Sequence, residues 1–250
     1  YDQDLYKKAI TLARRTIEIQ FRLIQREAPY LALKDRQTYI NTFGFNYEMA
    51  FSYAMQGNAG RNLALFSRLN KQGLLEEIEK RQAQLAALSG PQNTIANELR
   101  QLIQRFSSKG ISQEQREKLS KQKQELERKL YRILPELKPR LVQIKQIAEI
   151  IPINGVLLEF QRYEPYGVSN PADKGWEEPR YLAFILKPNG KITTVDLGLA
   201  QTIENRIQQA LIASEEGLAD AQQLWKEVGD LVIKPLKESI GDAETLFISP

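Results

Sequence analysis

The chain has 250 residues, of which 42% are hydrophobic and 26% are charged, and its formal net charge is +4. This composition is ordinary for a globular protein and argues against wholesale disorder, and the length suits one large domain or two modest ones. The sequence contains no cysteine and no histidine, which excludes disulfides, thiolate metal sites and catalysis by a cysteine or histidine of this chain. We therefore expect no catalytic, cofactor-binding or metal-binding residue here, and a reducing, cytoplasmic compartment.

The positive charge is concentrated in the first part of the sequence. Residues 1–150 carry 26 Lys and Arg against 16 Asp and Glu, whereas residues 151–250 carry 9 against 15. A basic half can indicate nucleic-acid binding. However, basic residues alternate with Glu and Gln through residues 116–132, and no basic run is interleaved with aromatic residues. The pattern favours solvated helical faces and argues against nucleic acid as a partner. A membrane partner is not expected either, because no apolar stretch approaches roughly 18 uncharged residues.

Residues 1–70 are predicted to form helices. Pro29 should end the first helix, an aromatic-rich pattern covers residues 38–55, and residues 57–60 are predicted to be a turn between helices. Helical hairpins of this size are typical of tetratricopeptide-type repeats, although the segment shows no clean 34-residue self-match. The face that we expect the first helix to bury has three- and four-residue spacing and consists of Leu5, Ala9, Leu12, Ala13, Thr16 and Ile19 or Gln20.

Residues 71–150 are predicted to form a long antiparallel helical hairpin followed by one connecting helix. Breakers at residues 89–91 and 107–110 interrupt the pattern, and Ser112 with Gln115 is typical of a capping box. The apolar stripe along each helix of this hairpin is too narrow to build a globular core. We therefore expect the hairpin to project from the rest of the protein as an arm or to lie along it. It is interpreted either as a spacer, which the sequence favours, or as a partner-binding arm. The seam expected on its last helix consists of Leu119, Leu126, Leu130 and Ile133.

After residue 150 the hydrophobic pattern changes to that of an α/β layout. Strands are predicted at residues 156–163, 181–187 and 192–197, with a hairpin turn at residues 188–191. Two helices follow, at residues 200–213 and 218–240, and Pro235 should kink the second. A last strand begins at Leu246. The chain opens on a helical pattern and closes on a strand, so we expect both ends to be cut from something longer and the sheet to be incomplete.

The sequence offers few candidates for catalytic or ligand-binding residues. Residues 57–62 contain glycine but lack the Gly-Lys-Ser/Thr of a phosphate-binding loop. Two pairs of adjacent carboxylates are interpreted as solvated charges, because neighbouring side chains usually diverge rather than meet in one pocket. The loop before Trp176 carries another charged pair, and we expect Trp176 to anchor that loop. The charged pairs are Glu177 with Glu178, Glu215 with Glu216, and Asp173 with Lys174.

The order of the motifs in the last hundred residues resembles the opening of the CHAT domain, a caspase-like family often found behind tetratricopeptide repeats. The motifs that carry the resemblance are the strand at residues 157–163, the approach to the next strand at 176–186, the turn at 195–198, the helix end at 233–236 and the terminal strand at 246–250. With the helical lead-in, the resemblance covers roughly residues 45–250. It implies an N-terminal portion of a caspase-like α/β domain at residues 151–250.

The resemblance implies that the parent protein is a cysteine peptidase with a His–Cys dyad. Both dyad positions would lie beyond Pro250, so no catalytic residue is carried over to this chain. The expected partner is then either another protein or the missing C-terminal half of its own domain. Two alternatives remain open: a structural protein–protein interaction scaffold without peptidase activity, and a product of proteolytic processing that stays bound to its other half.

Overall fold

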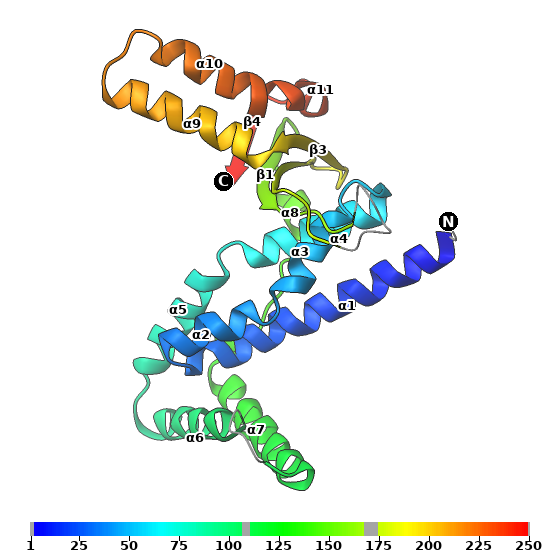
Figure 1. Ribbon diagram of the computed structural model, residues 1–250. Helices are drawn as coiled ribbons and strands as arrows, with labels where there is room; N and C mark the ends of the chain where they lie inside the picture. Colours follow the sequence, from blue (N-terminus) through cyan, green and yellow to red (C-terminus); the bar gives the residue numbers. More distant parts are fainter. Residues whose placement is uncertain (1–2, 107–110, 168–174, 250) are drawn as a thin grey trace. The chain divides into compact units, whose positions relative to one another are not determined.

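The computed structural model describes residues 3–106, 111–167 and 175–249, which are mostly helical with a small mixed four-stranded sheet (Figure 1). The sequence predicts a helical part followed by an α/β part, and the combination of helices with a small sheet is confirmed as an α+β class. The chain divides into two compact units. The first consists of residues 1–15, 45–69 and 142–250, and the second of residues 16–44 and 70–141. Each unit combines segments that are distant in sequence, whereas the sequence predicts three consecutive segments at 1–70, 71–150 and 151–250.

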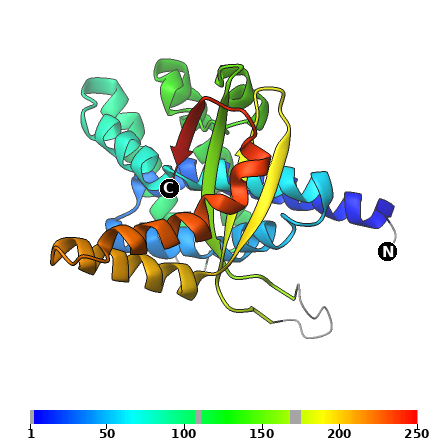
Figure 2. The ribbon, with the colours of Figure 1, turned by 90° about the horizontal axis from the view of Figure 1, so that it is seen from above.

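The sheet lies in the first unit and has the strand order β3-β2-β1-β4. Its strands are β1 (Gly155–Tyr163), β2 (Arg180–Leu186), β3 (Ile192–Leu199) and β4 (Thr245–Ser249). Antiparallel pairing joins β1 to β2 and β2 to β3, and β4 runs parallel to β1 beside it (Figure 2). The turn predicted at residues 188–191 is confirmed, since the Gly190 N–H donates to the Lys187 carbonyl. All four predicted strands are present.

Helices cover both faces of this sheet. The helices of the first unit are α3 (Gly44–Ser52), α4 (Gly57–Lys71), α8 (Ile144–Ile150), α9 (Ala200–Glu215), α10 (Ala221–Val232), η3 (Lys234–Leu236) and α11 (Lys237–Ile240). On one face, Leu182 and Phe184 pack with Ala64 and Leu65 of α4. On the other, Leu236 of η3 packs with side chains such as Leu158. The kink predicted at Pro235 is confirmed by the 3-10 turn between α10 and α11.

Residues 57–60 differ from the prediction, because they are the first turn of α4 rather than a connecting turn. Gly57 begins the helix with a φ of 80°. Gly60 lies so close to the preceding segment that a Cβ atom on it would overlap the carbonyl oxygen of Tyr53. The two glycines thus allow a tight entry into α4, and they do so for different reasons.

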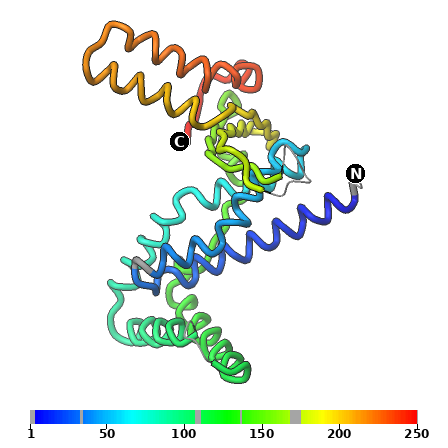
Figure 3. The backbone as a smooth tube through the Cα atoms, in the orientation of Figure 1, coloured from blue at the N-terminus to red at the C-terminus, as the bar shows by residue number. Residues whose placement is uncertain are grey.

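The second unit holds the rest of α1 (Gln3–Glu27), which begins in the first unit. Its other elements are η1 (Ala28–Tyr30), α2 (Leu33–Asn41), α5 (Leu74–Ala86), α6 (Gly90–Phe106), α7 (Gln113–Ile133) and η2 (Pro135–Leu137). Helices α6 and α7 form an antiparallel hairpin (Figure 3), and the Ser112 capping box that opens α7 is confirmed. The prediction that these helices build no core is wrong. One apolar cluster contains Tyr30, Leu85, Ala96, Leu99, Ile103, Leu130 and Leu137.

The predicted face of α1 is wrong, and the predicted seam of α7 is confirmed at Leu126 and Leu130 but wrong at Ile133. In α1, Leu5, Leu12 and Ile19 are 63%, 65% and 50% exposed, and the buried positions are Ile10, Ile17, Phe21 and Ile24. In α7, Ile133 is exposed, whereas Lys123 and Glu127 are buried. Lys123 pairs with Glu27, and Arg26 Nε lies 3.0 Å from Glu127 Oε1. Paired charges thus occupy positions that hydrophobic periodicity assigns to solvent.

Candidate functional site

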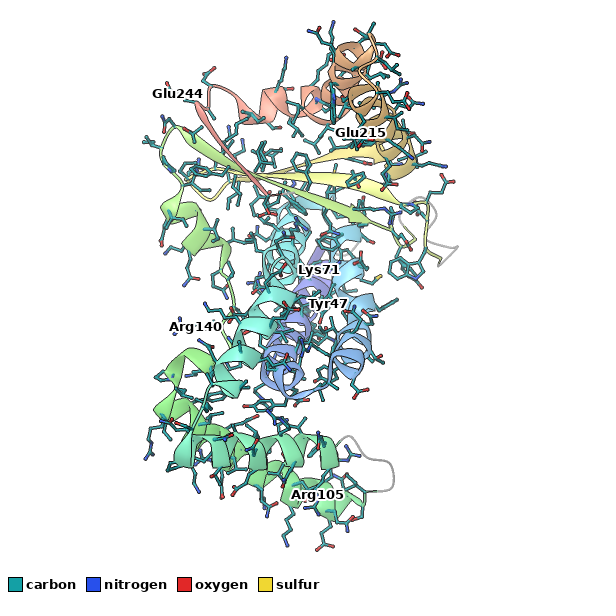
Figure 4. All side chains as sticks on the ribbon, turned by 90° about the vertical axis from the view of Figure 1, so that its left-hand side faces the viewer. Tyr47, Lys71, Arg105, Arg140, Glu215 and Glu244 are labelled. Carbon is teal, nitrogen blue, oxygen red and sulfur yellow. The ribbon has the colours of Figure 1, made fainter. Side chains whose placement is uncertain are left out.

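The junction of β1 and β4 combines a buried charge with an open sheet edge. In the parallel register, Leu157 lies beside Phe247 and Glu159 beside Ser249. Strand β4 ends at Ser249, while β1 continues to Tyr163. The loop before β1 fixes the start of β4, because the Asn154 carbonyl accepts from the N–H groups of Glu244 and Thr245. Figure 4 labels Glu244 at this end of the strand. The position of β4 is therefore set at its first residues.

A buried ion pair lies under β1 at this junction. Arg68 of α4 donates from Nε to Glu159 Oε2 at 2.9 Å, and from Nη1 to Gln161 Oε1 at 3.4 Å. The three side chains are buried. Burial raises the pKa of Glu159, and a hydrogen bond from Ser249 and the charge of Arg68 oppose this rise. The group can fix the sheet on α4, because Arg68 bonds to two side chains of β1.

The sequence analysis missed this pair, although the sequence holds a signal for it. Glu159 stands in the apolar run Leu157-Leu158-Glu159-Phe160 of a strand that helices cover on both faces. A carboxylate in such a place needs a buried partner. The partner could not be named from sequence, because Arg68 lies 91 residues earlier.

Strand β4 exposes apolar side chains on both of its faces. Leu246, Phe247 and Ile248 are 41%, 43% and 56% exposed, respectively. The segment before β1 adds Ile150 and Ile153, which are also exposed. The exposed apolar residues of β4 are therefore taken as a candidate interaction surface.

A cavity of about 310 Å³ lies where β1 ends and α9 begins. Within it, Arg162 Nε donates to Glu204 Oε1 at 3.0 Å, and the Tyr181 hydroxyl donates to the same oxygen at 3.2 Å. Its charged groups thus satisfy one another in part. The residues that line it are Arg162, Glu178, Pro179, Leu199, Gln201 and Glu204.

The predicted carboxylate pairs do not converge in the described residues. Glu178 lines the cavity beside β1, and its neighbour Glu177 does not. Glu215 and Glu216 are exposed at the C-terminal end of α9, where Figure 4 labels Glu215. Asp173 and Lys174 lie outside the described residues. Neither of these two described pairs therefore meets in one pocket, as paired-carboxylate catalysis requires.

Trp176 packs as the predicted anchor of its loop. Its ring lies edge-on to Tyr166, with ring centroids 4.9 Å apart, and to Phe45, at 5.6 Å. Tyr166 and Trp176 also form an antiparallel bridge, and the Tyr166 N–H donates to Ser52 Oγ. Aromatic packing and backbone pairing therefore close the base of this loop.

Within residues 3–106, 111–167 and 175–249, no group of three or more Asp or Glu side chains is arranged to hold a metal ion. In the same ranges, no helix has both the length and the apolar character needed to cross a bilayer. Comparison with protein-family models, curated proteins and solved structures finds no match for this chain.

Proposed function

We propose that this chain is the non-catalytic front part of a CHAT-family, caspase-like cysteine peptidase that acts in the cytoplasm. Residues 151–250 would be the first part of the caspase-like domain, and the helices of residues 1–70 a tetratricopeptide-like lead-in. The motifs that resemble the CHAT opening fall on β1, the entry to β2, the end of β3, η3 and β4. Their placement on consecutive elements of one sheet and its covering helices supports the proposal.

The observation that carries the proposal is the exposure of β4 at the edge of the sheet. It is parallel to β1, lies at the edge of the sheet and exposes three consecutive apolar residues. Parallel strands of α/β domains are normally buried on both faces. An uncovered strand of this kind fits a domain whose remaining strands and reactive residues are supplied by other polypeptide.

In such a peptidase, a cysteine thiolate attacks the scissile carbonyl, and histidine transfers the proton to the leaving amine. Water then hydrolyses the thioester and regenerates the thiol. This chain has neither residue, so its part would be structural. Its contributions would be the first strands of the sheet, the helices on both faces and the Arg68–Glu159 pair that joins them.

Sequencing the gene beyond the codon for Pro250 tests the proposal directly. A histidine and a cysteine, each at the end of a predicted strand, are expected there. A gene that encodes further strands without these two residues would contradict peptidase activity and would favour the scaffold.

The scaffold alternative has one specific observation in its favour. A groove of about 290 Å³ runs along the α6–α7 hairpin, with Leu102 and Leu126 between charged side chains such as Arg105 and Glu125. Apolar floors with charged rims are suited to an amphipathic partner helix. Loss of a partner on Leu126→Glu, with peptidase activity absent in the full gene product, would support this alternative.

A further inference from the structure

The groove along the α6–α7 hairpin is built by both helices in the same way. Each helix contributes four residues with the spacing i, i+3, i+4 and i+7, which places them on one helix face. Half-buried Leu102 and Leu126 form its apolar part. The charged residues at its rim are Glu98, Arg105, Glu125 and Lys129, two of each sign. The groove is thus electrically neutral, although Lys and Arg outnumber Asp and Glu in the hairpin that carries it.

Apolar residues recur every seven positions along the same two helix faces. On α7, Leu119 and Ile133 stand seven residues before and after Leu126. On α6, Ile95 stands seven residues before Leu102. None of these five side chains is buried, and Ile133 is 43% exposed. A seven-residue apolar repeat is typical of helices that pack against further helices. The hairpin therefore has a second apolar face besides the one in the core of the second unit.

Opposite charges lie across one end of the groove. Because α6 and α7 are antiparallel, Glu98 at the start of the α6 face lies opposite Lys129 at the end of the α7 face (Figure 3). Both residues are exposed, and neither forms an ion pair with another described residue of the chain. At the other end, Arg105 lies opposite uncharged Gln122. A partner that fits this groove must offer a cation to Glu98 and an anion to Lys129.

A second copy of the same hairpin meets these requirements. A two-fold axis parallel to the helices lays α6 of one copy on α7 of the other at the same level. Glu98 then faces the partner's Lys129, and Lys129 faces the partner's Glu98. At the middle of the groove, Leu102 meets the partner's Leu126. Each helix has an antiparallel neighbour on both sides, as in an up-and-down four-helix bundle. The groove is therefore complementary to itself in charge and in apolar spacing.

From this self-complementarity we propose that α6–α7 is a dimerisation hairpin, which packs on the same hairpin of a second copy and completes a four-helix bundle. The bundle buries the seven-residue apolar repeats of both copies and pairs Glu98 with Lys129 at two equivalent contacts. Burial of the apolar side chains supplies the affinity, and the charge pairs select the alignment. The inference goes beyond the proposed function and does not depend on it, because it uses residues of the hairpin alone.

Sedimentation equilibrium of the 250-residue chain, at concentrations up to about 100 µM, tests this inference. We expect a reversible equilibrium between monomer and dimer, because an interface of two helix pairs is modest in area. Leu126→Glu places a charge in the apolar middle of the bundle and should raise the dissociation constant of the dimer at least about 100-fold. A chain that stays monomeric would overturn the inference and favour a different protein as the occupant of the groove. A dimer that Leu126→Glu leaves intact would also overturn it, because that dimer would form through another surface.

Charge reversal at exposed residues tests the pairing without disturbing the fold. Glu98→Lys and Lys129→Glu each place like charges at both contacts and should weaken the dimer at least about 10-fold. The double variant Glu98→Lys with Lys129→Glu exchanges the signs, so its dissociation constant should return to within about threefold of the original. Glu117→Lys, an exposed reversal on α7 outside the groove, is the matched control and should leave the dimer unchanged. A double variant as weak as the single ones, or a control that weakens the dimer equally, would contradict the inference.

Discussion

Arg68 Nε and Glu159 Oε2 lie 2.9 Å apart in the interior of the first unit, although 91 residues separate them in the sequence. Their side chains join α4 to the centre of β1, and Ser249 at the end of β4 donates a hydrogen bond to the same carboxylate. One buried carboxylate thus connects the helical segment, the centre of the sheet and its open edge.

Removing Arg68 should destabilise the protein in a pH-dependent way. The pKa of Glu159 is raised above its ordinary value of 4.5, so Glu159 binds a proton more readily in the folded state than in the unfolded state. The stability that this group contributes is full below about pH 4.5 and is lost as pH rises through the raised pKa. Arg68→Met removes a group that lowers the pKa of Glu159. The stability that is lost as pH rises must therefore be larger in this variant. We expect about 3 kcal/mol at pH 8 and clearly less at pH 5, measured by urea unfolding.

The double variant Arg68→Met with Glu159→Leu is the control for this effect. Replacing both charges by apolar groups leaves no uncompensated buried charge, so most of the stability should return and its dependence on pH should weaken. A single variant that loses the same free energy at pH 5 and pH 8 would contradict an ionised Glu159 as the cause.

Gly60→Ala is expected to lower the free energy of unfolding by about 2 kcal/mol or more. The new methyl group would overlap the Tyr53 carbonyl oxygen and approach the Tyr6 hydroxyl, and backbone cannot move aside cheaply. Gly229→Ala is the matched control, since its Cβ meets no atom within 4 Å and it lies inside α10. In that variant the free energy of unfolding should rise by about 1 kcal/mol, because alanine has a higher helix propensity than glycine. Equal changes in thermal unfolding would disprove the close approach at Gly60.

Alanine substitutions at Leu130 and Ile133, which have side chains of similar size, test which residues of α7 are buried. Leu130 is fully buried, and Ile133 is 43% exposed. Leu130→Ala should therefore cost about 2–5 kcal/mol, and Ile133→Ala about 0.5 kcal/mol or less. Chemical denaturation followed by circular dichroism measures both. The opposite order would contradict the burial of Leu130 and the exposure of Ile133.

Ser112→Ala should cost about 1 kcal/mol, because its hydroxyl accepts from the Gln115 N–H at the start of α7. Gln124→Ala, an exposed position inside the same helix, serves as the control and should be neutral or slightly stabilising. Helix content and unfolding midpoint measure the difference. Identical behaviour of the two variants would show that the cap contributes nothing to stability.

Local signals in the sequence were sufficient for the strands, the turn at Gly190, the kink at Pro235 and the Ser112 cap. Each depends on neighbouring residues alone. Periodicity could not place Lys123 and Glu127 on the buried side of α7, because they are buried through ion pairs with residues about a hundred positions away. The same limit applies to the candidate site: the run around Glu159 indicates a buried partner, but only the fold identifies Arg68.

Peptide hydrolysis by the full gene product, before and after alkylation of its thiols with iodoacetamide, tests the central claim most directly. The 250-residue chain has no thiol to alkylate and should show no activity on a mixed peptide library. The full product should hydrolyse peptides, and alkylation should abolish this activity. Hydrolysis by the 250-residue chain itself, or activity of the full product that survives alkylation, would contradict the assignment of this chain as the front part of a cysteine peptidase.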